Sequence, residues 1–140
     1  MNPIAKVFIG AHVGVFRMTG GRVGGHLMGL PVVLLTTTGR KTGKARTVPL
    51  MTLPDGDHFV IIASNNGAPT HPAWFNNLAA NPEVTVEARG RKFVALAEIA
   101  KGDERTRLWN AVATKVPRYD GYKAKAGDRE IPVVVLKEKR

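Results

Sequence analysis

The chain has 140 residues, 44% of them hydrophobic, and this length fits one compact domain with a single core. It contains no cysteine, which excludes disulfide scaffolds, thiol nucleophiles and thiolate metal sites and is typical of a reducing compartment. No apolar run approaches the roughly 20 residues of a membrane span, and the amino terminus lacks a signal-peptide pattern. We therefore expect a soluble, cytoplasmic protein.

Positive charge is concentrated early in the chain. The formal net charge is +10, and the first 54 residues hold seven Lys or Arg residues but no Asp or Glu. Four of those seven charges lie between Arg40 and Arg46. This clustering favours an anion site in the amino-terminal half, with a merely solvated basic face as the alternative.

The amino-terminal segment predicts a helix followed by a loop. Asn2 and Pro3 have the pattern of a helix cap with proline at the first helical position, and apolar residues then recur at helical spacing. We expect an amphipathic helix within residues 1–18, packed on the core or lying on a membrane surface. The glycine-rich stretch 19–29 predicts a loop at the start of the main domain, residues 19–140.

The remaining chain alternates predicted strands, turns and helices. A polar turn at residues 39–46 and a second turn at 54–57 separate the first three strands, which we expect to form a meander. Helices are expected at residues 73–80 and from an Asp103 cap to Pro117. Short apolar or alternating runs predict six strands, at residues 32–37, 48–53, 58–63, 84–88, 93–99 and 131–136. Such hairpins with inserted helices predict a mainly β, α+β fold: a six-stranded antiparallel barrel or curved sheet.

Several catalytic motifs are missing. Ser64 is the only serine and has no G-x-S-x-G context, and the four histidines have no metal-ligand spacing, so no metal site is predicted. The loop at residues 39–44 lacks the spacing of a Walker phosphate loop, and no G-x-G-x-x-G pattern is present.

The turn at residues 39–46 is the main candidate site. Arginine offers a planar fork for two phosphate oxygens, lysine a point charge, and the neighbouring threonines and turn amides further donors. Because no acid precedes Asp55 and cysteine is absent, any catalysis is expected to use a bound organic cofactor. Aromatic and amide residues between Ser64 and Asn81 are candidates to line its flat ring, although Trp74 and Phe75 also suit a core.

Ordered motifs carry a resemblance to a known family from about Phe16 to Leu136. They include Thr-Thr-Thr-Gly-Arg-Lys-Thr-Gly at residues 36–43, Pro-Ala-Trp-Phe-Asn-Asn-Leu at 72–78 and Arg-Glu-Ile-Pro-Val-Val-Val at 129–135. With these motifs the chain resembles the deazaflavin-dependent nitroreductase family, split β-barrel oxidoreductases that use coenzyme F420. The resemblance implies a six-stranded split barrel, and hydride transfer from the reduced coenzyme to a quinone or nitroaromatic acceptor.

The same resemblance implies roles for individual residues. Arg40, Lys41 and Arg46 would bind the phosphate and anionic tail of the coenzyme. Ser64 would donate a hydrogen bond to the acceptor, and Tyr119 and Tyr122 would face it, so these three are the expected catalytic residues. The other expected coenzyme-binding residues are Thr38, Gly39, Thr42, Pro49, Met51, Ala63, Asn65, Trp74 and Asn77, with Ser64 also against the ring.

Two positions depart from the nitroimidazole-reducing members of that family. Met51 stands where those members carry a tyrosine, and Asn65 stands where they carry a lysine. The implied substrate pocket therefore differs from theirs, and activity on that drug class does not follow from the resemblance.

Other functions remain open at this point. The same barrel could bind FMN, or the protein could carry the deazaflavin without turnover. The pI of about 10.4 favours a nucleic-acid binder, but aromatic residues make up only 6% of the chain and no reader motif is present. We expect a small-molecule acceptor, no specific nucleic acid, a monomer or homodimer, and a possible peripheral contact of the first helix with the inner face of the membrane.

Overall fold

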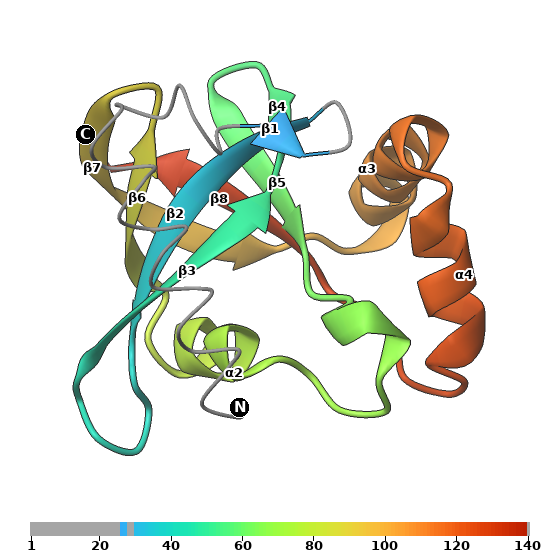
Figure 1. The fold of residues 1–140 in the computed structure, drawn as a ribbon, viewed down its shortest axis with the longest axis horizontal. Helices are drawn as coiled ribbons and strands as arrows, with labels where there is room; N and C mark the ends of the chain where they lie inside the picture. Colours follow the sequence, from blue (N-terminus) through green and yellow to red (C-terminus); the bar gives the residue numbers. More distant parts are fainter. Residues whose placement is uncertain (1–25, 28–29, 140) are drawn as a thin grey trace.

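The computed structural model describes residues 26–27 and 30–139, and in this part of the chain eight strands form one curled antiparallel sheet (Figure 1). The strands are β1 (His26–Leu27), β2 (Leu30–Thr38), β3 (Ala45–Met51), β4 (Leu53–Asp55), β5 (His58–Ile62), β6 (Glu83–Ala88), β7 (Arg91–Ile99) and β8 (Val133–Glu138). The helices are α2 (Ala73–Ala80), α3 (Gly102–Lys115) and α4 (Arg118–Lys125), with a short 3-10 turn η1 (Asn65–Gly67).

The sheet curls because β3 and β4 are one bent segment that contacts both edges. The strand order is β1-β2-β6-β7-β8-β5-β4, and β3 pairs with β2. At the bend, the Thr52 N–H donates to the carbonyl of Pro31 at 2.9 Å and its hydroxyl donates to the carbonyl of Val60 at 3.0 Å. Thr52 thus links the two edge regions, and the result is the antiparallel barrel-like fold that the sequence predicts.

Three details of the strand prediction need correction. The expected strand 48–53 is divided at Thr52, and the short strands β1 and β4 add to the six expected. The predicted meander of the first three strands is wrong, because β5 pairs with β4 and β8 and not with β3. Part of the turn expected at residues 54–57 belongs to β4, which ends at Asp55.

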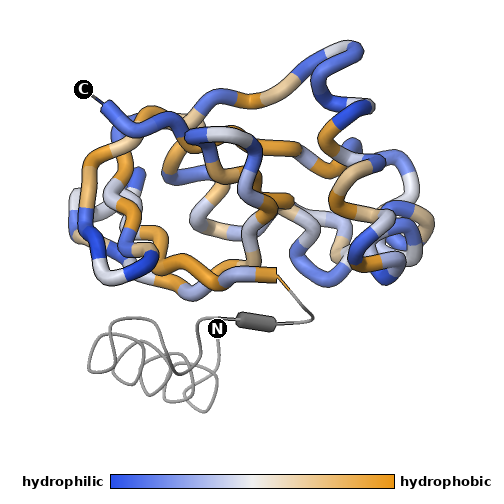
Figure 2. The backbone as a smooth tube through the Cα atoms, turned by 90° about the horizontal axis from the view of Figure 1, so that it is seen from above, coloured by the Kyte–Doolittle hydropathy of each residue, from blue (hydrophilic) through white to orange (hydrophobic). Residues whose placement is uncertain are grey.

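The barrel interior is filled with apolar side chains. Every second residue of a strand points to the same face, and Val33, Leu35, Ile61 and Val86 are each almost fully buried on the inner face. Phe75 of α2 joins the same core, so α2 packs against the interior residues. Figure 2 shows apolar segments along the strands and hydrophilic ones at the turns. Each such side chain stabilises the fold by about 1.5–3 kcal/mol relative to leaving it exposed.

A second core lies between the sheet and helices α3 and α4. Leu108, Trp109 and Val112 of α3 are buried in one cluster with Val60 of β5 and Val133 of β8. Figure 1 shows both helices packed on one side of the sheet. The indole N–H of Trp109 donates to the Asp120 carboxylate at 3.1 Å and so ties α3 to α4.

The helix predictions need two corrections. Asp103 is not the cap of α3, because the helix begins at Gly102 and Lys101 occupies the cap position. Asp103 lies in the first turn, where the helix dipole favours a carboxylate. Helix α4 was not predicted, because its sequence is polar and contains Gly121. Two aromatic residues, Tyr119 and Tyr122, pack it against the core and compensate for that low propensity.

Some expectations lie outside the described residues. These are the helix within residues 1–18, the boundary at residue 19 and most of the glycine-rich stretch. In the described part of the chain, no helix is long and apolar enough to cross a membrane.

Candidate functional site

The basic loop between β2 and β3 is a tightly bonded hairpin end, as the sequence predicts. The Gly39 N–H donates to the Lys44 carbonyl at 2.8 Å, and the Gly43 N–H donates to the Gly39 carbonyl at 2.8 Å. The Thr42 hydroxyl accepts from the Lys44 N–H at 3.2 Å. A Cβ on Gly39 would lie 2.7 Å from the Thr42 hydroxyl oxygen, so this close approach requires glycine.

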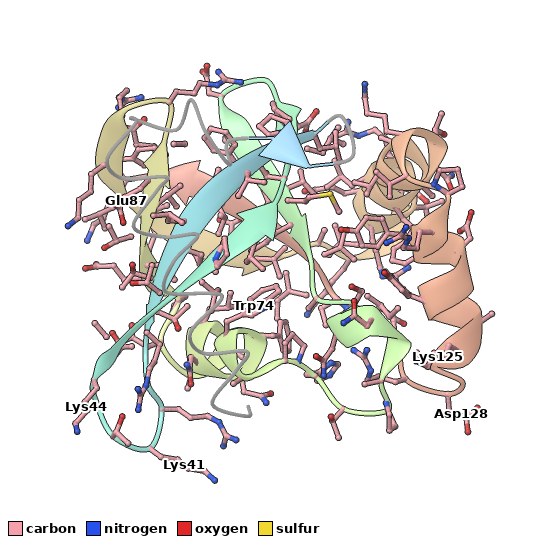
Figure 3. The ribbon with its side chains drawn as sticks, in the orientation of Figure 1. Lys41, Lys44, Trp74, Glu87, Lys125 and Asp128 are labelled. Carbon is pink, nitrogen blue, oxygen red and sulfur yellow. The ribbon has the colours of Figure 1, made fainter. Side chains whose placement is uncertain are left out.

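The basic side chains of this hairpin have no acidic partner among the described residues. Arg40, Lys41, Lys44 and Arg46 are exposed, and none of them forms an ion pair or a side-chain hydrogen bond there. Figure 3 shows Lys41 and Lys44 at the tip of the loop, directed away from the sheet. Several cations elsewhere are paired, as in Arg107 with Asp55 at 3.0 Å. Unpaired cations on a rigid loop form a site prepared for an anion.

Asn77 of α2 fixes the base of the hairpin. Its side-chain oxygen accepts from the Arg40 N–H at 3.1 Å, and its side-chain nitrogen donates to the Thr37 hydroxyl at 3.2 Å. Asn77 and Thr37 are both buried, so these hydrogen bonds satisfy groups that water does not reach. The described contacts therefore give Asn77 a role in placing Arg40.

The loop with Ser64 follows β5 and has an unusual backbone. Asn65, Asn66 and Gly67 have positive φ values of 48°, 55° and 77°, a conformation that glycine adopts readily, asparagine less readily and most other residues rarely. The Ser64 hydroxyl has no hydrogen-bond partner among the residues that the structure describes. It is therefore free to donate to a bound molecule. Asn65 instead uses its side-chain nitrogen to bond the Thr70 carbonyl at 3.0 Å.

Arg129 holds this loop from the side of β8. Its guanidinium donates to the carbonyls of Ser64 at 2.6 Å, Ala68 at 2.9 Å and Ala63 at 3.1 Å. It also lies 2.8 Å from Nδ1 of His71, whose ring is 4.8 Å from the ring of Phe75 in α2. A series of contacts thus connects the Ser64 loop to α2, and α2 connects to the basic hairpin through Asn77.

The two tyrosines of α4 differ in their surroundings. Tyr119 is 93% buried, with its ring against Trp109 at 6.3 Å and Tyr122 at 5.7 Å. Burial, and secondarily Tyr122, raises the pKa of Tyr119 to about 12. Its hydroxyl therefore stays protonated at neutral pH. Tyr122 is only partly buried, so of the two expected catalytic tyrosines it is the more accessible.

Comparison with known proteins identifies the family. The family model for F420H(2)-dependent quinone reductases matches residues 9–138. The chain belongs to this family. It is 39% identical over 129 residues to an F420H(2)-dependent quinone reductase of Mycobacterium tuberculosis, an alignment that covers 89% of this chain and 86% of that protein.

Solved structures similar to this family member share its fold. An F420-H2 dependent reductase superposes with a TM-score of 0.70 at 39% identity, covering 76% of this chain and 94% of that one. A second structure, described as a domain-swapped dimer, has a TM-score of 0.72 at 34% identity and covers 97% of this chain and all of the other. The split-barrel fold and the membership of an F420-dependent family, both expected from the sequence, are confirmed.

Within this family member, the expected coenzyme-binding residues lie in three places. Thr38, Gly39, Arg40, Lys41, Thr42 and Arg46 lie on the hairpin; Trp74 and Asn77 lie on α2; Ala63, Ser64 and Asn65 lie on the loop after β5. Contacts through α2 connect these three groups in series. Among the described residues, no three His, Asp or Glu side chains are grouped as metal ligands.

Pro49 and Met51 are separated from that arrangement by strand alternation. In the β2–β3 register Arg46 is opposite Thr37, while Pro49 is opposite Leu34 and Met51 is opposite Val32. Residues 49 and 51 therefore point to the face of β3 that is opposite to Arg46. Met51 packs against Val32 and Leu34 there. A ligand that contacts the side chains of Pro49 or Met51 would therefore lie on the face of β3 opposite to the Arg46 side chain.

Sequence reasoning missed the parts played by Arg129, His71 and Thr37. Arg129 begins one of the motifs that carry the resemblance, yet no role was assigned to it, because its acceptors are 58 to 66 residues away in the chain. A lone arginine before a strand and a lone histidine before a helix carry no local signal. Their connection depends on β5 and β8 being neighbours.

Proposed function

We propose that this chain is an F420H2-dependent reductase that transfers a hydride from the reduced coenzyme to a quinone. The observation that carries the proposal is a basic hairpin joined through α2 to the Ser64 loop: among the described residues, the hairpin cations have no acidic partner and the Ser64 hydroxyl has no hydrogen-bond partner. Family membership names the coenzyme and the acceptor class of its relatives. The two ends of the site suit a ligand with an anionic tail and a flat redox head.

Arg40, Lys41 and Arg46 are proposed to bind the phosphate and acidic tail of F420. Their side chains are exposed and unpaired among the described residues, so binding does not have to break an existing ion pair. Asn77 holds the backbone of Arg40 in place and lowers the ordering cost of that contact. Thr38, Gly39 and Thr42 would complete this end of the site with backbone and hydroxyl groups.

Ser64 and Tyr122 are proposed to act at the other end, where the reduced ring supplies a hydride. The Ser64 hydroxyl would donate a hydrogen bond to the acceptor oxygen as negative charge develops on it. Asn65 and Trp74 would border the ring and exclude water, whereas Ala63 is fully buried and would support the ring from the core. Tyr122 would border the acceptor, whereas buried Tyr119 would support it through the ring contact at 5.7 Å.

The test is oxidation of reduced F420 by menadione in the presence of the purified protein, followed at the absorbance of the oxidised coenzyme. We expect protein-dependent turnover, and quenching or a shift of F420 fluorescence at low-micromolar protein. No spectral change at saturating F420, together with tight FMN uptake, would overturn the proposal.

The alternatives that the sequence leaves open predict different results. Binding without turnover across a panel of quinones would indicate a carrier, and turnover with nitroaromatic compounds alone would change the acceptor class. The relatives above 30% identity that are described by function are named for F420, so FMN has no support from them. Nucleic-acid binding that survives physiological salt would favour a different function altogether.

A homodimer in the cytoplasm is part of the proposal. One similar structure is described as a domain-swapped dimer, which makes a dimer the first assembly to test by sedimentation. Residues 1–18 are the segment proposed to contact a membrane surface, and flotation with anionic vesicles would test it.

A further inference from the structure

Arg129 makes an unusually complete set of hydrogen bonds for a side chain with no carboxylate partner. Its Nε donates to the Ala68 carbonyl at 2.9 Å, Nη2 donates to the Ser64 carbonyl at 2.6 Å, and Nη1 lies 3.1 Å from the Ala63 carbonyl and 2.8 Å from Nδ1 of His71. Four acceptors thus surround one guanidinium, and all of them lie on the segment from Ala63 to His71. Within the described part of the chain, Arg129 forms no ion pair.

Shielding the charged guanidinium of Arg129 from water costs free energy, which an apolar side chain packed in the same place would not cost. Partial burial lowers the pKa of Arg129, a cation that is partly shielded from water and has no countercharge among the described residues. An arginine always remains charged, so the loop carbonyls must replace the lost hydration. Because all four acceptors lie between Ala63 and His71, the position of this loop depends on Arg129.

The contact also fixes the state of His71. Arginine can only donate, so Nδ1 of His71 must accept, and the neutral ring then carries its proton on Nε2. Burial, and secondarily the charge of Arg129, lowers the pKa of His71 and keeps the ring neutral. His71 stands just before α2, so Arg129 connects the loop at Ser64 to the helix that places the basic hairpin.

Helix α4 supports the loop from another side. A Cβ on Gly67 would lie 2.9 Å from the Tyr122 carbonyl and 3.0 Å from the Cβ of Lys125. Figure 3 shows Lys125 near the end of α4 that faces η1. The loop is therefore held between α4 and Arg129, which follows α4 after only a short turn.

We propose that Arg129 is a positioning residue of the reductase: its planar guanidinium holds the Ser64 loop and neutral His71 in the arrangement that receives the coenzyme ring. The expected effect on coenzyme binding rests on the proposed function, but the ordering of the loop can be measured without any coenzyme. The planar fork is essential, since a lysine at this position keeps the charge but cannot reach four acceptors in one plane.

The experiment compares wild-type protein with Arg129→Lys by hydrogen exchange, F420 titration and turnover. We expect exchange of the amides of residues 64–70 to rise about tenfold or more, and F420 affinity to fall about tenfold, as the loss of charged hydrogen bonds predicts. The slope of log Kd against log salt should stay unchanged, because the hairpin that binds the tail is intact. Unchanged loop exchange, or unchanged affinity beside faster exchange, would overturn the proposal.

Arg105→Lys is the matched control. Arg105 also caps a carbonyl, that of Ile131 at 2.8 Å, and lies over Trp109, but it has no contact with the Ser64 loop. We expect it to lower the melting temperature and leave loop exchange and F420 affinity within about twofold of wild type, since its partners, Ile131 and Glu130 at 3.2 Å, follow Arg129 in the chain and do not lie on the Ser64 loop.

A second variant covers the case in which Arg129→Lys does not fold. His71→Phe removes one of the four acceptors while keeping a ring beside Phe75, and it should raise loop exchange about threefold, a partial loss of the same network. No change in that variant counts against the proposal. If wild-type protein fails to bind F420, the proposed function is wrong, while the exchange measurements still decide whether Arg129 orders the loop.

Discussion

The side-chain oxygen of Asn77 accepts a hydrogen bond from the backbone N–H of Arg40 at 3.1 Å, although 37 residues separate them. The other half of the same amide donates to Thr37. One buried side chain therefore sets the position of the basic hairpin relative to α2. The first prediction follows from this contact.

Asn77→Ala should destabilise the protein and weaken F420 binding together. The change leaves the Arg40 N–H and the Thr37 hydroxyl without partners, which costs about 1–3 kcal/mol for each buried group left unsatisfied. Urea unfolding and F420 titration would measure both effects. The control is Asn76→Ala on the same helix, whose side chain makes no hydrogen bond to the described residues. Equal effects of the two variants would contradict the role given to Asn77.

Removing hairpin charge should weaken coenzyme binding and flatten its salt dependence. Lys41→Ala combined with Arg46→Ala removes two unpaired cations, and the slope of log affinity against log salt should become less steep. Titrations of F420 at several salt concentrations would show the change. Lys101→Ala with Lys115→Ala makes the same change in net charge on α3 and at its start. If this control pair lowers affinity as much, net charge and not the hairpin is responsible.

Gly67→Ala should destabilise the Ser64 loop by more than backbone conformation alone explains. Gly67 has a φ of 77°, and an added Cβ would lie 2.9 Å from a backbone oxygen of α4. Gly56→Ala is a close control, because Gly56 has a φ of 62° but nothing lies within 4 Å of its added Cβ. The control should cost about 1 kcal/mol, the typical price of a strained φ. Unfolding free energies would compare them, and equal losses would argue against close packing of η1 on α4.

Stability should fall in mildly acidic solution because of His71. Its pKa in the folded protein is lower than in the unfolded chain, mainly through burial. The unfolded chain therefore takes up the proton first, so this contribution is present above about pH 6.5 and is lost as the pH falls from there through the lower folded pKa. Protonation also removes the Nδ1 acceptor of Arg129. Urea unfolding between pH 5 and about 8 should show a smaller acid loss in His71→Gln than in wild type. Parallel pH profiles would show that His71 is not responsible.

Local sequence signals were enough to predict the basic hairpin and most of the strands. The polar turn with Gly39 and Gly43 between two apolar runs specifies a β-hairpin, and the clustering of four cations there needs no partner from elsewhere in the chain. Alternating residues such as Val84, Val86 and Ala88 predict their strand in the same way, because side chains of a half-buried strand repeat every second residue.

The other half of the site, formed by the Ser64 loop, Arg129 and α4, was decided only by tertiary structure. Helix α4 has a polar sequence and is stabilised by the packing of Tyr119 against Trp109. The bend at Thr52 brings the edges of the sheet together, and the pairing of β5 with β8 brings Arg129 to Ser64. Such contacts join residues far apart in the chain, so no local pattern encodes them, and the free energy that selects them comes from burial and hydrogen bonding of the assembled fold.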